Sequence, residues 1–363
     1  MNENTPRLRS LDALRGFDMF WIVGGRDLLV GLTAITGWGV LRTAEAQARH
    51  VEWNGFTLWD GIFPLFLFLA GVSMPLSFAK RLEQGRSRTQ LAGHALRRGL
   101  VLVLLGLVYN GLLGERTEPL RCASVLGRIG LAWMFAAWIS LFLRTRGQVL
   151  VAAGILLGYW ALLVLVPVPG QAAPSLEPGK TFTDWFDRNW LPGRLYRGDR
   201  DPEGLLGTLP AIVTALAGSW AGMQLVRRDR TPAARSGGLA LAGALALGLG
   251  WLWHPWFPVN KNLWSSSFVL VTAGGSALLL ALFHWLIDVR GWHAWSFPFV
   301  VIGTNAITIY MLGSFIDFDG IGALLLGGPV AWRFHPSLLP LVTLALEWVL
   351  LYALWRKRLF LRV

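Results

Sequence analysis

Apolar runs long enough to cross a lipid bilayer recur along almost the whole chain, and they restrict its fold more than any other feature. A helix needs about 20 mostly apolar residues to span the hydrocarbon core, and its backbone polar groups must be satisfied internally. The sequence therefore predicts an all-α integral membrane protein with about ten transmembrane helices in one bundle. The expected spans are approximately 11–32, 61–78, 99–113, 124–143, 148–167, 206–226, 237–254, 266–287, 297–316 and 336–355.

The composition and the charge pattern agree with a membrane protein. Apolar residues make up 54% of the chain and charged residues only 15%, unlike an ordinary soluble domain. The net charge of +12 does not indicate a nucleic-acid partner, because the basic residues are scattered over short connections instead of forming one face. Cytoplasmic loops retain Lys and Arg. We therefore expect both termini to be cytoplasmic, in a bacterial inner (cytoplasmic) membrane, with lipid around the bundle.

Two connections are long enough to form structure outside the bilayer, at about 33–60 and 168–205. The predicted topology places both on the non-cytoplasmic side. Long connections frequently carry function, so we expect this side to admit a bulky polar substrate. The whole of 1–363 is treated as a single transmembrane domain with these two loops.

A compact polar cluster precedes the apolar run 61–78. His50, Asn54 and Asp60 lie within eleven positions of one another, at the mouth of a predicted membrane helix, where polar groups are costly and suggest a function. An imidazole can remove a proton from an amine or hydroxyl, or accept an acyl group itself. Asn54 and Asp60 could orient that ring, but Asp60 could equally cap the following helix. These three residues are the candidate catalytic group.

Short motifs of polar and aromatic residues lie between the apolar runs, from Arg7 to about Tyr310. They include Asp12-Ala-Leu-Arg15-Gly16, His50-x-x-Trp53-Asn54-Gly55, Asp60-x-x-Phe63-Pro64, Asp201-Pro-Glu203, Asn260-Lys261-Asn262-Leu-Trp264 and Gly303-Thr-Asn305. Together these motifs resemble the transmembrane acyltransferases typified by heparan-α-glucosaminide N-acetyltransferase, and the His-Trp-Asn-Gly and Asn-Lys-Asn-Leu-Trp blocks are the most specific part of the match. The resemblance implies transfer of an acetyl group from cytoplasmic acetyl-CoA to a sugar or amino sugar at the non-cytoplasmic face, with His50 as the histidine used.

Cationic and amide side chains near these motifs are expected to hold the acetyl-CoA cosubstrate. Forked guanidinium donors suit its phosphates, although Arg15 could instead pair with Asp12, and Asn305 could bond between helices. At Arg26 the relatives of the human enzyme carry an asparagine, so no role is transferred to it from the family. The donor-binding candidates are Arg15, Arg26, Arg128, Lys261, Asn262 and Asn305.

Two other functions fit the same residues. Intramembrane Arg, Asp and His also mark transport paths, so a transporter of a small anion is one alternative; an acyltransferase with a lipid-linked acceptor is another. Gly154-x-x-x-Gly158 and Gly218-x-x-x-Gly222 permit close helix approach, within the bundle or in a homodimer. No metal is expected, because the histidines lack ligand spacing.

Overall fold

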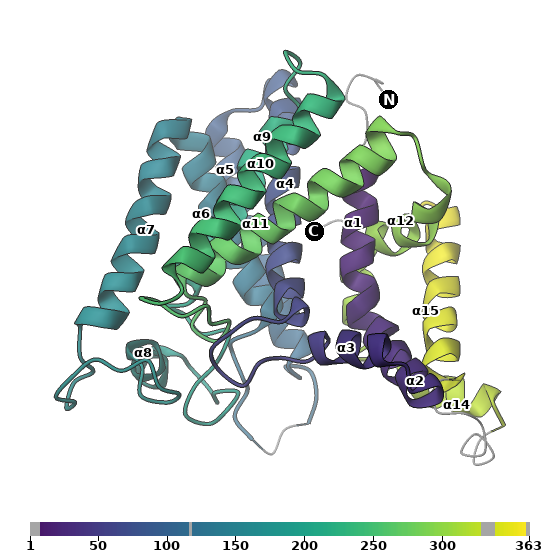
Figure 1. Ribbon diagram of the computed structural model, residues 1–363, viewed down its shortest axis with the longest axis horizontal. Coiled ribbons are helices and arrows are strands. Elements are labelled where there is room, and N and C mark those ends of the chain that lie inside the picture. The colour runs from purple at the N-terminus through teal and green to yellow at the C-terminus, as the bar shows by residue number, and fades with distance from the viewer. Residues whose placement is uncertain (1–7, 116–117, 328–337, 361–363) are drawn as a thin grey trace.

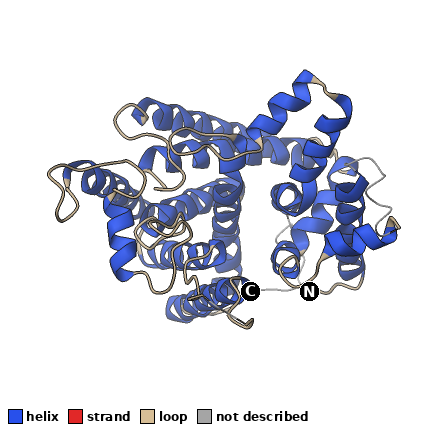
Figure 2. Cartoon of the chain, turned by 90° about the horizontal axis from the view of Figure 1, so that it is seen from below, coloured by secondary structure: helices blue, strands red, loops and turns tan. Residues whose placement is uncertain are grey.

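The computed structural model describes residues 8–115, 118–327 and 338–360, and within these ranges it consists of helices and loops without a β-strand (Figures 1 and 2). In chain order the elements are α1 (Arg9–Phe20), η1 (Trp21–Gly25), α2 (Arg26–Thr36), α3 (Gly39–Gln47), η2 (Leu58–Gly61), α4 (Ile62–Glu83), α5 (Arg88–Tyr109), α6 (Val125–Phe142), α7 (Thr145–Leu165), α8 (Phe182–Trp190), α9 (Thr208–Leu225), α10 (Pro232–Trp253), α11 (Ser266–Phe283), η3 (His284–Val289), η4 (Ala294–Ser296), α12 (Phe297–Thr304), α13 (Ala306–Leu312), α14 (Phe318–Leu325) and α15 (Leu338–Arg356).

Each of the ten expected apolar runs coincides with a helix, which confirms the all-helical class of the described chain. Among the described residues, eight helical stretches are long and apolar enough to cross a membrane, and the broken pair α12 and α13, bent by 61°, brings this to nine if the pair is one span. The expected span 206–226 forms α9, which has 18 residues but is not among the eight. The number of spans and the orientation of the termini stay predictions.

The helices form two groups that are joined through α1 (Figures 1 and 2). In the larger group α4 packs on α9, α5 on α6, and α10 on α11. In the smaller group α1 packs on α12, and α15 contacts both α12 and α14. Because α1 also contacts α4 and α11, it positions the smaller group against the larger one.

Glycines allow the central helices α4 and α9 to touch through their backbones. A Cβ added at Gly218 would lie 2.0 Å from the carbonyl oxygen of Phe68, and one at Gly222 would lie 2.3 Å from that of Val72. By contrast, a Cβ at Gly154 or Gly158 of α7 would meet nothing within 4 Å. Of the two Gly-x-x-x-Gly motifs, therefore, the one on α9 is used inside the bundle, whereas the one on α7 faces open space within this chain.

Replacing Gly218 with alanine is expected to destabilise the fold by about 1–3 kcal/mol, because the added methyl group forces α9 away from the α4 backbone. The matched variant Gly154→Ala should be neutral or slightly stabilising, since alanine favours a helix where there is space. Thermal unfolding of both variants in detergent would measure the difference. Equal unfolding temperatures would contradict the close α4–α9 contact.

The two long connections lie at the same end of the helices, the lower end in Figure 1, which we call the loop end. Both contain helices. Within 33–60, α2 continues to Thr36 and stops where Gly37 adopts a left-handed φ of 62°, and α3 follows. Within 168–205, α8 begins with a capping box between Thr181 and Asp184. The loop end is therefore a folded layer that can build a site.

Candidate active site

Three segments meet around His50 at the loop end. The chain bearing His50 is fixed by two distant hydrogen bonds, from Gly55 N to Val259 O at 2.8 Å and from Trp53 Nε1 to Leu176 O at 2.8 Å. The first joins it to the turn between α10 and α11, and the second joins it to the segment before α8. The position of His50 therefore depends on contacts with distant parts of the chain as well as on its neighbours in the sequence.

Asp60 holds the imidazole of His50 directly. The Nδ1 atom of His50 lies 2.6 Å from Oδ1 of Asp60, whose side chain is only 1% exposed, while that of His50 is 50% exposed. The other carboxylate oxygen of Asp60 accepts hydrogen bonds from the backbone N and the hydroxyl of Thr57, at 3.1 and 3.0 Å. Asp60 is thus the partner of the ring and the N3 residue of the capping box of η2, whose N-cap is Thr57. It does not cap the following helix, because the N-cap of α4 is Gly61, which has no side-chain cap.

Lys261 approaches the same ring from the turn that precedes α11. Its Nζ lies 3.0 Å from Nε2 and 3.2 Å from Nδ1 of His50. Because Nδ1 faces the carboxylate of Asp60, the tautomer that satisfies this contact carries its proton on Nδ1 and leaves Nε2 as the acceptor. Burial lowers the pKa of the Lys261 ammonium, although the charges of Asp60 and Glu203 oppose that effect.

Asn54 contacts a second amide instead of the imidazole. Its side-chain oxygen accepts a hydrogen bond of 3.0 Å from Nδ2 of Asn260, a fully buried residue whose own oxygen accepts from the backbone N of Leu263 at 2.9 Å. This pair joins the segment bearing His50 to the turn bearing Lys261. The sequence marks Asn54 as a partner of the ring, whereas the structure gives it a role in aligning the two segments.

A buried cation lies behind this site. Nη2 of Arg128 donates to Gly204 O at 2.9 Å, and its guanidinium carbon lies 5.1 Å from the ring centroid of Trp264. The Nε and Nη1 atoms of Arg128 are buried and have no hydrogen-bond partner among the described residues. A buried donor without a partner is costly, so Arg128 remains a candidate for contact with a substrate.

A charged network that the sequence analysis does not include in the site lies beside Arg128. Nε and Nη2 of Arg121 form two hydrogen bonds to Asp201, of 2.8 and 2.6 Å, and Nη2 also contacts Glu203. Burial alone would lower the pKa of Arg121, but the two carboxylates raise it above the ordinary value. Asp201 and Glu203 belong to a stretch that the family resemblance includes, directly before an apolar run, whereas nothing in the sequence singles out Arg121.

The six donor-binding candidates are not gathered in one place. Arg26 lies near His50: its Nε donates to Ala48 O at 3.1 Å, and its guanidinium lies 5.6 Å from the Trp59 ring centroid. Asn262 is half-buried in the turn that carries Lys261. Asn305 lies at the break between α12 and α13, where its Nδ2 donates to Leu359 O at 3.1 Å.

Arg15 belongs to a second cationic group, toward the opposite end of the helices. Its Nη2 donates to Ser73 Oγ on α4 at 3.1 Å, and its Nη1 lies 3.4 Å from Asp12. The charges of Arg15 and Arg81 act on Arg98 of α5, whose guanidinium carbon lies 4.1 Å from the Trp133 ring centroid. Like charges gathered in this way favour an anionic ligand.

Two curated proteins are similar to this chain. Heparan-alpha-glucosaminide N-acetyltransferase of Homo sapiens is 28% identical over an alignment of 424 residues, covering 99% of this chain and 60% of that protein. The protein of the same name from Mus musculus is 27% identical, covering 87% of this chain and 56% of its own length. The chain thus spans somewhat less than two thirds of these relatives. No protein-family model matches it. The similarity confirms the resemblance predicted from the motifs.

Proposed function

We propose that the chain transfers an acetyl group from cytoplasmic acetyl-CoA to a sugar or amino sugar at the opposite face of the membrane, using His50. One observation carries the proposal: a half-exposed imidazole is held by a buried carboxylate at 2.6 Å and touched by an ammonium group at 3.0 Å. These are the parts needed to remove a proton and to stabilise negative charge. The similarity to two acetyltransferases supports the same reaction class.

In the proposed reaction His50 acts as a general base. The acceptor's amine or hydroxyl attacks the carbonyl carbon of the thioester while Nε2 of His50 takes the proton that the acceptor loses. Asp60 keeps the proton on Nδ1 and stabilises the imidazolium that forms. The C–S bond then breaks, and the CoA thiolate takes a proton from the imidazolium, which restores the neutral ring and completes the transfer.

Lys261 stabilises the oxyanion of this reaction. A tetrahedral intermediate places a negative charge on the former carbonyl oxygen, and a fixed cation beside it lowers the barrier. Nζ of Lys261 lies within 3.2 Å of both ring nitrogens, so it adjoins the atom that the acceptor must approach. Only the protonated lysine can fulfil this role.

The phosphates of the donor are assigned to the second cationic group. Arg15, Arg81 and Arg98 lie close enough for their charges to interact, and Nε of Arg98 is buried with no hydrogen-bond partner among the described residues. Phosphate oxygens would satisfy such donors and relieve their mutual repulsion. The pantetheine arm would then run from this group toward His50.

The direct test is an acetyl-transfer assay with the purified protein in nanodiscs, labelled acetyl-CoA and a panel of sugars and amino sugars. We expect label to appear in a sugar product, and CoA alone to raise the unfolding temperature of the protein. Absence of labelled product together with donor-independent solute uptake into proteoliposomes would support the transporter alternative instead.

Replacing Lys261 with arginine is expected to extend activity to higher pH. Because burial lowers the pKa of Lys261, the ammonium should lose its proton, and the reaction its oxyanion partner, at a lower pH than an ordinary lysine would. A guanidinium stays charged throughout. The pH profile of kcat should lose its alkaline decline in K261R but keep it in K180R, a matched change at an exposed lysine. An unchanged decline in K261R would exclude Lys261 as its source.

A further inference from the structure

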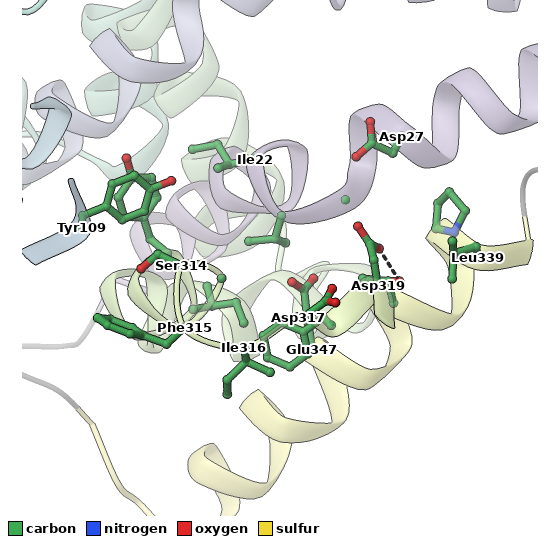
Figure 3. A pocket seen from close by; sticks show the side chains of 18 residues that line it. Ile22, Asp27, Tyr109, Ser314, Phe315, Ile316, Asp317, Asp319, Leu339 and Glu347 are labelled. Carbon is green, nitrogen blue, oxygen red and sulfur yellow. Dashed lines mark hydrogen bonds between the residues drawn. The ribbon is translucent and has the colours of Figure 1, made fainter. Parts of the chain in front are cut away.

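A cavity of about 720 Å³ lies between η1, α2, α13, α14 and α15, away from the contacts of His50 (Figure 3). Its described lining contains four carboxylates and no Lys, Arg or His. The volume falls in the range of small-molecule sites, about 300–1,000 Å³. The four carboxylates are Asp27, Asp317, Asp319 and Glu347.

Glu347 distinguishes this cavity from a simple acidic surface. It lies in the middle of α15, is only 5% exposed, and its Oε2 is buried without a hydrogen-bond partner among the described residues. Figure 3 shows its side chain among those that line the cavity. Two other acids are already engaged: Asp317 accepts from Gly320 N, and Asp319 accepts from the Thr343 hydroxyl, both at 2.8 Å. A carboxyl oxygen left without a partner at this depth costs free energy, which a ligand that donates a hydrogen bond to it would recover.

Aromatic rings form another part of the lining. Tyr109 and Tyr310 stack with their centroids 4.7 Å apart and their planes 15° apart. Both tyrosines line the cavity, so their stacked rings give it an aromatic wall beside its carboxylates.

We propose that this cavity binds a cationic sugar, the protonated form of an amino-sugar acceptor, before acetyl transfer. Glu347 is the counter-ion of its ammonium group, the exposed carboxylates accept hydrogen bonds from its hydroxyls, and the tyrosine pair contacts its ring. The identity of the ligand as acceptor rests on the proposed function, whereas the binding does not. The attacking amine must be neutral, so this site holds the acceptor in its resting, protonated state and no bond is made there.

The proposal is tested by calorimetric binding of glucosamine and glucose without any acyl donor, at a pH below the pKa of the glucosamine amine. Nanodiscs of phosphatidylglycerol and phosphatidylcholine are used, so that lipid supplies no primary ammonium. We expect the parent to bind glucosamine at least about tenfold more tightly than glucose, and Glu347→Gln to abolish that preference while glucose binding is unchanged. Glu177→Gln, which removes an exposed carboxylate from the loop end, should keep the preference.

Unfolding of a variant would not be mistaken for loss of sugar binding, because the unfolding temperature and a second variant are also measured. Glu347→Gln keeps the size of a side chain whose Oε2 has no hydrogen-bond partner among the described residues, so it should not lower the unfolding temperature. Asp27→Asn, at an exposed position, should weaken the binding of glucosamine and glucose alike, because the exposed carboxylates accept hydrogen bonds from sugar hydroxyls. Equal affinities for the two sugars, an intact preference in E347Q, or binding of ethanolamine in place of glucosamine would overturn the proposal. A cation preference without acetyl transfer would instead reject the proposed function alone.

Discussion

Replacing His50 with alanine is expected to lower kcat for acetyl transfer by about 10²–10⁴-fold, the usual contribution of a general base. Donor binding should be almost unchanged, because the phosphates are assigned to Arg15, Arg81 and Arg98 on α1, α4 and α5, away from the segment that carries His50. Folding should also persist, since the His50 side chain is half-exposed and fills no core position. Initial rates at saturating acetyl-CoA, with CoA-induced thermal stabilisation measured in parallel, would separate these effects.

The control for this variant is His293→Ala, which removes an exposed histidine from the connection before α12. It should retain the full rate. Asp60→Asn keeps the shape of the ring's partner but removes its charge, so it should reduce kcat substantially with little change in stability. A rate within tenfold of the parent in H50A would exclude His50 as the base.

The same variant distinguishes two mechanisms. If His50 is a base, labelled CoA should not exchange into acetyl-CoA in the absence of acceptor, since no acyl-enzyme forms. If His50 is instead the nucleophile, exchange should occur in the parent and vanish in H50A. Either result identifies which atom receives the acetyl group first.

The helices could be predicted from the sequence because membrane solvation acts on each run separately. Every apolar run of sufficient length has to satisfy its own backbone, so local composition is enough to place α4, α6 or α11. The break at Asn305 could not be placed in this way, because the residues of α12 and α13 are as apolar as those of an uninterrupted span. The number of complete spans depends on such breaks.

The candidate site was only partly predictable, for a different reason. His50 and Asp60 are ten residues apart and share one segment, so spacing alone suggested their contact. Lys261 is 211 residues away from His50, and its place at the ring depends on how α10 and α11 meet the segment before α4. The motifs marked both residues but could not show that they touch.

Glu347 could not be identified as a candidate site residue from sequence motifs. It is a single carboxylate in the apolar run 336–355, without a neighbouring signature, and no resemblance pointed to it. Its depth in a predicted membrane helix was the available signal, because an ionisable residue there is by default a candidate for function. The sequence does not show what Glu347 could bind. That inference depends on the cavity around Glu347 and on the unpaired Oε2 atom of its side chain.

Acetyl-CoA supplied on one side of oriented proteoliposomes is expected to acetylate a sugar supplied only on the other. His50 lies at the loop end near Arg26 of α2, whereas Arg15 lies in α1, on the other side of the kink at Gly24. The pantetheine arm of a donor whose phosphates are bound at Arg15 must therefore extend through the bundle to place the thioester near the imidazole.

Orientation is established first, with single cysteines replacing Lys180 or Arg86 after removal of Cys122. We expect an impermeant thiol reagent to label the cysteine at 180 from outside, and the one at 86 only after the membrane is opened. Acetyl-CoA on the Arg86 side should then yield product from glucosamine on the Lys180 side, and donor on the Lys180 side should yield none. If product formed only when both substrates shared a side, the donor would reach His50 through the loop end, and the cationic group around Arg15 would need another ligand.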